Sequence, residues 1–113
     1  IYTAGMPSPA WRAMYGRLLG SLPPTTLVKH WGDIDEGGFR IAATIAAVAR
    51  TAGFSLQPYC MSPADVPMEM RVSASARTLE RIHHFACAAG WSELGQAMRE
   101  AKFVAEQEAL ERE

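Results

Sequence analysis

The feature that most limits the fold is a β-branched, aromatic run followed by an apolar helical one. Residues 25–31 (TTLVKHW) lie between a Pro pair and a Gly, which predicts a buried strand. Residues 39–52 are apolar nearly all round and stop before Gly53, which predicts a helix packed against a sheet. Residues 54–59 predict a further strand. This alternation favours an α/β fold with a mostly parallel sheet flanked by helices.

The flanking segments extend this pattern. Residues 1–3 predict a strand end, and Ser8 is expected to cap a helix over residues 9–19. The last third has helical periodicity and no strand signal. After an irregular connection at residues 60–71, we expect a helix from Ser73 to about residue 89 and one or two more over 91–113.

Length and composition exclude several classes of protein. With 113 residues, 49% of them hydrophobic and 20% charged, the whole chain is expected to form a single globular domain. It opens without an initiator Met or a basic signal sequence, so we interpret it as part of a longer protein. No apolar stretch reaches the roughly 20 residues of a membrane span. Two cysteines favour a reducing cytoplasm, and a net charge of -1 gives no overall attraction to nucleic acid.

The residues with the clearest chemical potential are Asp33 and Asp35. They follow the predicted buried strand and precede a helix, and in parallel α/β sheets ligands bind beyond the carboxyl ends of the strands. Their i, i+2 spacing in an extended backbone places both carboxylates on one side. Mg²⁺ or Mn²⁺ suits such a pair, because Mg²⁺ is usually held by one or two carboxylates and substrate phosphates.

The next residues fit the same site. Glu36 adds a third carboxylate to the candidate metal ligands, Gly37 and Gly38 permit a phosphate to approach the helix N-terminus, and Arg40 can pair with it. The competing interpretation is that the carboxylates only cap the helix and complement its dipole. Because one cap needs one carboxylate, the residues alone leave both interpretations open.

Several other side chains could be assigned a catalytic or binding role but are better explained by packing or solvent exposure. His30 is expected to be a packed strand residue, and Arg77 with Arg81 a solvated helix face. Cys60 and Cys87 are expected to be buried small hydrophobic residues. The tryptophans and the methionines at 61, 68 and 70 are expected to fill the core, although the Met-rich connection is alternatively a cover for a neighbouring domain.

The segment Trp31-Gly32-Asp33-Ile34-Asp35, with Gly38-Phe39-Arg40-Ile41 after it, resembles the strand-to-helix junction of toprim domains. It is most similar to the C-terminal domain of JetD, the nuclease subunit of Wadjet plasmid-defence systems, and more distantly to the A subunit of topoisomerase VI. Residues 105–108 (AEQE) also resemble the JetD family. The roles of Glu106 and Glu108 stay open, because residues i and i+2 lie on different faces of a helix.

The resemblance implies a Mg²⁺-dependent DNA endonuclease centre with Asp33 and Asp35 as metal ligands. It further implies plasmid DNA and SMC-like subunits as partners, leaves a homodimer open, and involves no membrane. Toprim domains also use a Glu from an earlier strand that would precede this chain, so the fragment is expected to be catalytically incomplete. The alternative is a toprim-like scaffold that binds DNA or a partner protein without cutting.

Overall fold

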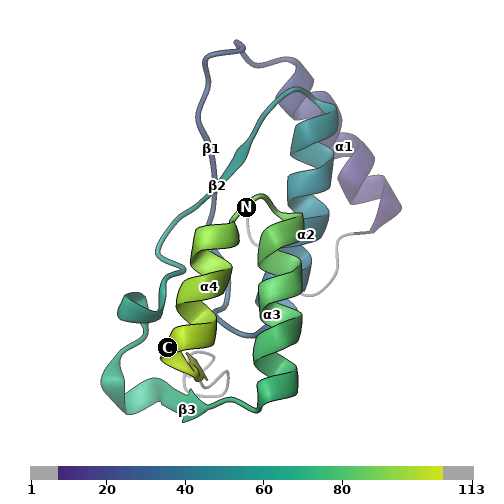
Figure 1. Cartoon of the computed structure of the whole chain (residues 1–113). Helices are drawn as coiled ribbons and strands as arrows, with labels where there is room; N and C mark the ends of the chain where they lie inside the picture. Colours follow the sequence, from purple (N-terminus) through teal and green to yellow (C-terminus); the bar gives the residue numbers. More distant parts are fainter. Residues whose placement is uncertain (1–7, 106–113) are drawn as a thin grey trace.

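The structure, a computed structural model, describes residues 8–105 and is a mixed α/β arrangement (Figure 1). The elements in chain order are α1 (Pro9–Gly20), β1 (Val28–His30), α2 (Glu36–Thr51), β2 (Leu56–Pro58), the 3₁₀ turns η1 (Pro63–Asp65) and η2 (Met68–Met70), β3 (Arg71–Ser73), α3 (Ala76–Ala88), α4 (Ser92–Ala101) and β4 (Phe103–Ala105). The predicted strand at residues 1–3 lies outside the described residues.

The helix ends follow from local chemistry. The Ser8 hydroxyl accepts a hydrogen bond from the Trp11 amide at 3.1 Å, so the predicted cap of α1 is confirmed. Gly53 and Gly90 follow the ends of α2 and α3 with positive φ angles of 92° and 86°, a conformation that glycine adopts without strain. The predicted stops of both helices are therefore confirmed.

Two separate two-stranded sheets form in the described part of the chain. β1 and β2 pair in parallel, with Val28 opposite Leu56 and His30 opposite Pro58, as the alternation of elements predicts. β3 and β4 pair antiparallel. The prediction of a last third without strands was wrong. Three-residue strands are too short to show a period of two, and they form here through pairing between residues about thirty positions apart.

The start of α3 also differs from expectation. Ser73 belongs to β3, and Ser75 is the N-cap, with its hydroxyl accepting from the Thr78 amide at 3.1 Å. Both serines satisfy the capping preference, and the pairing of β3 with β4 decides between them. Likewise α2 begins at Glu36, three residues before the predicted start, because Asp35 provides its cap.

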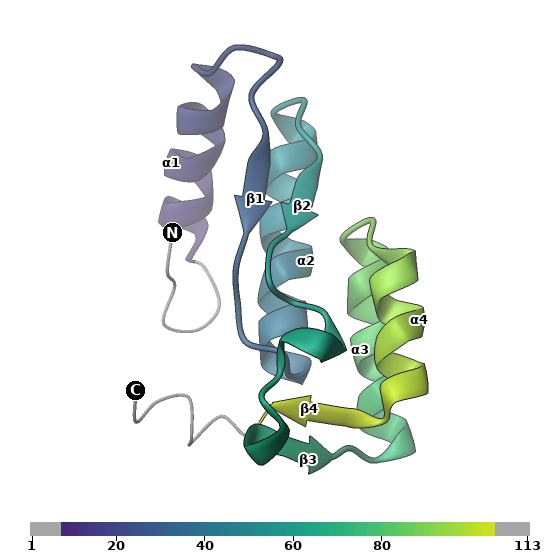
Figure 2. The same cartoon turned by 90° about the vertical axis from the view of Figure 1, so that its left-hand side faces the viewer.

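α2 is the centre of the core. Its Phe39, Ala42, Ile45, Ala46 and Ala49 are buried, and α1 and α3 pack against it. In Figure 2 the strands β1 and β2 lie in front of α2, and no helix is drawn over their near face. Within residues 8–105, helices therefore cover this small parallel sheet on one side only. The strand predicted over residues 25–31 is shorter than expected, and the prediction that it is buried was wrong for its exposed face.

Some expected core residues lie at the surface. Trp31 is 73% exposed and Met68 77% exposed, whereas Trp91 and Met61 are buried as predicted. Both cysteines are free and exposed, so their predicted burial was wrong. Hydrophobic character alone does not reveal which face of a strand or turn is covered. None of the helices in the described part of the chain is long and apolar enough to cross a membrane.

Candidate functional site

The two aspartates lie in the loop that joins β1 to α2. From position 27 to position 34 exposed residues alternate with buried ones, except that Gly32 is half-buried; Asp33 is exposed and Ile34 is buried. The main-chain carbonyl of Ile34 accepts a hydrogen bond from the Ala105 amide at 3.0 Å. The loop is thus anchored on one side by a core side chain and on the other by β4.

Asp35 is the N-cap of α2. Its Oδ1 accepts a hydrogen bond from the Gly38 amide at 2.7 Å, and its backbone is extended. Burial raises the pKa of Asp35 above its ordinary value, although the Gly38 amide acts in the opposite direction. The neighbouring charges of Asp33 and Glu36 raise this pKa further. The capping interpretation is therefore confirmed for Asp35, and negative charge is concentrated around it.

Asp33 differs from Asp35 in that its side chain does not cap a helix. Its carboxylate is exposed, and within residues 8–105 it makes no hydrogen bond or ion pair. Its main chain, however, lies against Gly38: a Cβ there would overlap with the Asp33 carbonyl oxygen and stand 2.7 Å from the carbonyl carbon. Gly38 is needed because the loop packs directly on the first turn of α2.

Of the other predicted site residues, some make structural contacts and others are exposed. Glu36 forms an ion pair with Arg81 of α3, at 3.0 Å between Oε2 and Nε. The Gly38 amide is taken by Asp35, and the exposed Arg40 lies one turn into α2. In the part of the chain that the structure describes, no three His, Cys, Asp or Glu side chains come together as metal ligands. The metal roles of the carboxylates and the phosphate contacts of Gly37, Gly38 and Arg40 stay predictions.

His30 packs on the buried side of β1, as predicted. Its side chain is 8% exposed, and its ring stacks with Trp91 at 6.4 Å between centroids. Burial lowers the pKa of His30, so the neutral ring is favoured. Its Nε2 finds no hydrogen-bond partner among the described residues and lies 2.8 Å from where a Cβ on Gly32 would be. Gly32 therefore leaves room for this ring.

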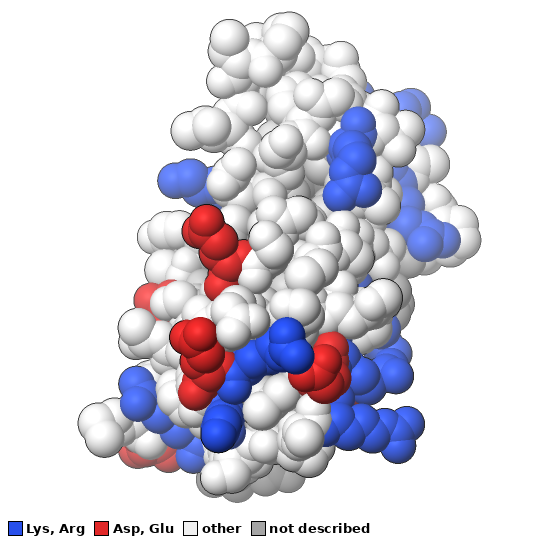
Figure 3. All heavy atoms as spheres, in the orientation of Figure 1, with Lys and Arg blue, Asp and Glu red and all other residues white. Residues whose placement is uncertain are grey.

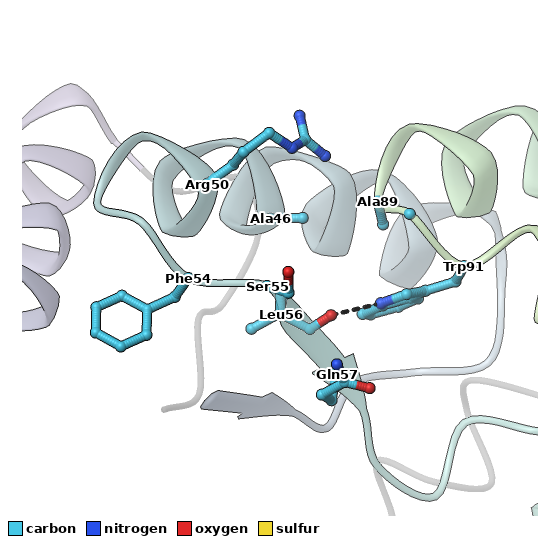
Figure 4. A pocket seen from close by; sticks show the side chains of 9 residues that line it. Ala46, Arg50, Phe54, Ser55, Leu56, Gln57, Ala89 and Trp91 are labelled. Atoms are coloured by element: carbon cyan, nitrogen blue, oxygen red, sulfur yellow. Dashed lines mark hydrogen bonds between the residues drawn. The ribbon is translucent and has the colours of Figure 1, made fainter. Parts of the chain in front are cut away.

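A hollow of about 250 Å³ lies elsewhere, between β2, α2 and the turn after α3 (Figure 4). The Trp91 indole crosses it and donates a hydrogen bond to the Leu56 carbonyl at 2.8 Å. Arg50, at its edge, donates to the Ala88 carbonyl at 3.1 Å. The hydrogen bonds of Trp91 and Arg50 hold elements together at this hollow, and neither aspartate lines it.

Charged side chains of neighbouring helices form ion pairs with each other. Arg99 of α4 binds Glu80 of α3 at 2.8 Å, and Arg81 binds Glu36. Figure 3 shows basic and acidic side chains side by side over the lower part of the face formed by α3 and α4. Arg71 donates to the Val66 carbonyl. These contacts fit the predicted solvated helix face.

A family model described as Wadjet protein JetD, C-terminal, matches residues 1–113. The chain belongs to this JetD family. Membership makes it part of a Wadjet plasmid-defence system, whose JetD subunit works in a multi-subunit complex with SMC-like proteins. The similarity of residues 31–41 to JetD is thereby confirmed. Neither the curated proteins nor the solved structures gave a match.

Two features of this JetD site had little signal in the sequence. The anchoring of Ile34 by Ala105 depends on β4, a strand of three residues. The exposed side of β1 could not be told from the buried side by sequence, because each side carries both apolar and polar residues. Glu106 and Glu108 lie outside the described residues.

Proposed function

We propose that this JetD domain is a toprim-like centre for Mg²⁺-dependent cleavage of DNA, with Asp33 and Asp35 as the cation ligands. The observation that carries the proposal is the exposed, uncommitted carboxylate of Asp33 beside a second carboxylate. A cap requires only Asp35. The additional aspartate, at the carboxyl end of a parallel strand, is therefore better explained by a ligand than by stability.

The donor set suits a hard cation held partly by water and substrate. Asp35 uses Oδ1 for the Gly38 amide, and its other oxygen is uncommitted among the described contacts. The negative charges of Asp33 and Glu36 raise the pKa of Asp35, so a cation would relieve repulsion already present. Mg²⁺ is typically bound through one or two carboxylates, which two aspartates supply.

The chain's own residues would act as positioning groups. The bound cation would polarise a phosphodiester and stabilise the departing oxygen. Asp33 is held in place because its carbonyl packs on Gly38, and Asp35 because its carboxylate caps α2. The N-terminus of α2 favours negative charge, so a substrate phosphate would be stabilised at the same end.

The topology supports the toprim-like assignment. β1, α2 and β2 form a strand–helix–strand unit with parallel strands, and the aspartates follow its first strand. This is the local arrangement that the resemblance to toprim domains implies. The antiparallel β3–β4 pair is an addition that holds the aspartate loop through the Ala105–Ile34 hydrogen bond.

The test pairs metal binding with cleavage. Mn²⁺ is titrated into the isotope-labelled domain while NMR signals of residues 32–38 are followed, and nicking of supercoiled plasmid by the full-length protein is measured in Mg²⁺ and in EDTA. Asp33→Asn should abolish local broadening and cleavage while leaving stability within about 0.5 kcal/mol, because its carboxylate makes no hydrogen bond or ion pair with residues 8–105. Glu93→Gln, an exposed carboxylate on α4, is the control and should change neither.

A non-cutting scaffold is the second candidate function. It is favoured by the structural use of Asp35 as a cap and of Glu36 as the partner of Arg81. In that case Mn²⁺ would produce no local broadening at millimolar concentration, and Asp33→Asn would have no effect on any DNA activity. This result would refute the nuclease proposal.

A further inference from the structure

The face of the β1–β2 sheet that no helix of residues 8–105 covers carries an ordered set of side chains. Leu27 and Trp31 are 75% and 73% exposed, and Lys29 between them is exposed on the same side. Val28 and His30 point into the core. β1 ends at His30, and exposure at every second position continues beyond it to Trp31 and Asp33.

A second aromatic residue stands beside this stripe. Tyr59 is 53% exposed and follows Pro58, the register partner of His30. The Tyr59 amide donates to the His30 carbonyl at 2.8 Å, which keeps Tyr59 alongside Trp31 at the carboxyl end of the sheet. The Lys29 ammonium lies 5.7 Å from the centre of the Tyr59 ring. Two aromatic rings and a cation thus occupy one small surface.

Such a surface is built for a ligand. Parallel sheets are normally covered on both faces, and adjoining exposed large hydrophobic residues mark binding surfaces. A protein partner is less well suited, because lysine is depleted from the cores of protein interfaces and Lys29 lies within this patch. A lysine among exposed aromatic rings is instead the combination that binds unpaired nucleic acid.

We propose that Lys29, Trp31 and Tyr59 form a platform for an unpaired DNA strand, with bases stacked on the two rings and a phosphate near the ammonium. The platform would present the strand to Asp33, which continues the same exposed stripe. The proposal rests on the proposed DNA-cleaving function for its substrate, and it specifies that substrate as locally single-stranded. Stacking on each ring is expected to contribute about tenfold or more in affinity.

The test measures binding of fluorescein-labelled dT12 by anisotropy in EDTA, at several salt concentrations. Trp31→Ala and Tyr59→Ala should each weaken binding about tenfold, and Lys29→Ala should lower the dependence of log affinity on log salt by about 0.7. Met68→Ala, which removes an equally exposed hydrophobic side chain outside the patch, is the control and should bind normally. Circular dichroism verifies that each variant is folded.

Three outcomes overturn the platform: no binding of dT12, binding unaffected by Trp31→Ala and Tyr59→Ala, or equal dependence on both residues for a duplex of the same length. If the two variants alter only self-association or binding to another protein, the face is a protein interface and the proposal is wrong. Because EDTA removes divalent cations, the binding assay does not depend on whether the domain cleaves DNA. Asp33→Asn should retain dT12 binding. A wild-type protein that binds dT12 through the two rings but does not cleave plasmid DNA in Mg²⁺ counts against the nuclease proposal alone.

Discussion

Gly37 and Gly38 stand side by side in the first turn of α2, yet replacing each with Ala should have opposite effects. A Cβ on Gly37 meets only the Asp35 carboxylate oxygen at 3.6 Å, an ordinary contact. A Cβ on Gly38 overlaps with the carbonyl oxygen of Asp33 and stands 2.7 Å from its carbonyl carbon. Because the obstacle is main chain, no side-chain rotation relieves it.

The magnitudes follow from these contacts. Gly37→Ala gains helix propensity and loses unfolded-state entropy, so it should stabilise the protein by about 0.5–1 kcal/mol. Gly38→Ala has the same gain, but overpacking costs about 1–3 kcal/mol. Moving the loop also endangers the Asp35 cap, worth about 1 kcal/mol. The net expectation for Gly38→Ala is a loss of about 1–3 kcal/mol.

Urea unfolding of the two variants, followed by circular dichroism, measures the difference in the free energy of unfolding. We expect the variants to lie about 1.5–4 kcal/mol apart, with the wild type between them. Values within 0.5 kcal/mol of each other would refute the close packing of the aspartate loop on α2. If the loop is also the metal site, Gly38→Ala should weaken Mn²⁺ broadening, whereas Gly37→Ala should preserve it.

Three further predictions concern the surroundings of the site. Trp91→Phe should destabilise the protein by about 1–3 kcal/mol in urea unfolding, since the Leu56 carbonyl loses its indole donor. Ala105→Pro should cost about 1 kcal/mol and shift the NMR signals of the aspartate loop, because the donor to the Ile34 carbonyl is removed. The pKa of His30 is lowered by burial, so its contribution to stability is complete above its ordinary pKa of 6.5 and is lost as the pH falls through the lowered pKa. His30→Phe should remove this pH dependence.

Each of these has a matched control. Trp31→Phe, at an exposed ring, should change stability by less than about 0.5 kcal/mol. Ala105→Gly keeps the amide donor and should leave the loop signals in place. His84→Gln, at an exposed histidine, should retain the wild-type loss of stability below pH 6.5. A steep acid loss that persists in His30→Phe would show that another group is responsible.

The sequence predicted helix ends, the position of α2 and the pairing of the parallel strands. Ser8 and Gly53 marked a helix start and a helix end, and the apolar segment after Gly38 predicted α2 within three residues. Parallel pairing of β1 and β2 followed from their separation by a helix. These predictions hold because caps, stops and crossovers depend on residues close in sequence.

Tertiary contacts decided the rest. Ser73 and Ser75 were equal candidates for a cap until β3 paired with β4, and Glu36 was an open carboxylate until α3 brought Arg81 to it. The sequence by itself determined that aspartates would follow a strand and precede an apolar helix. Only the tertiary structure decided that Glu36 pairs with Arg81 and that β4 holds the loop at Ile34, while the Asp33 carboxylate has no partner among residues 8–105. Burial, ion pairing and main-chain packing involve partners distant in the chain, which no local pattern encodes.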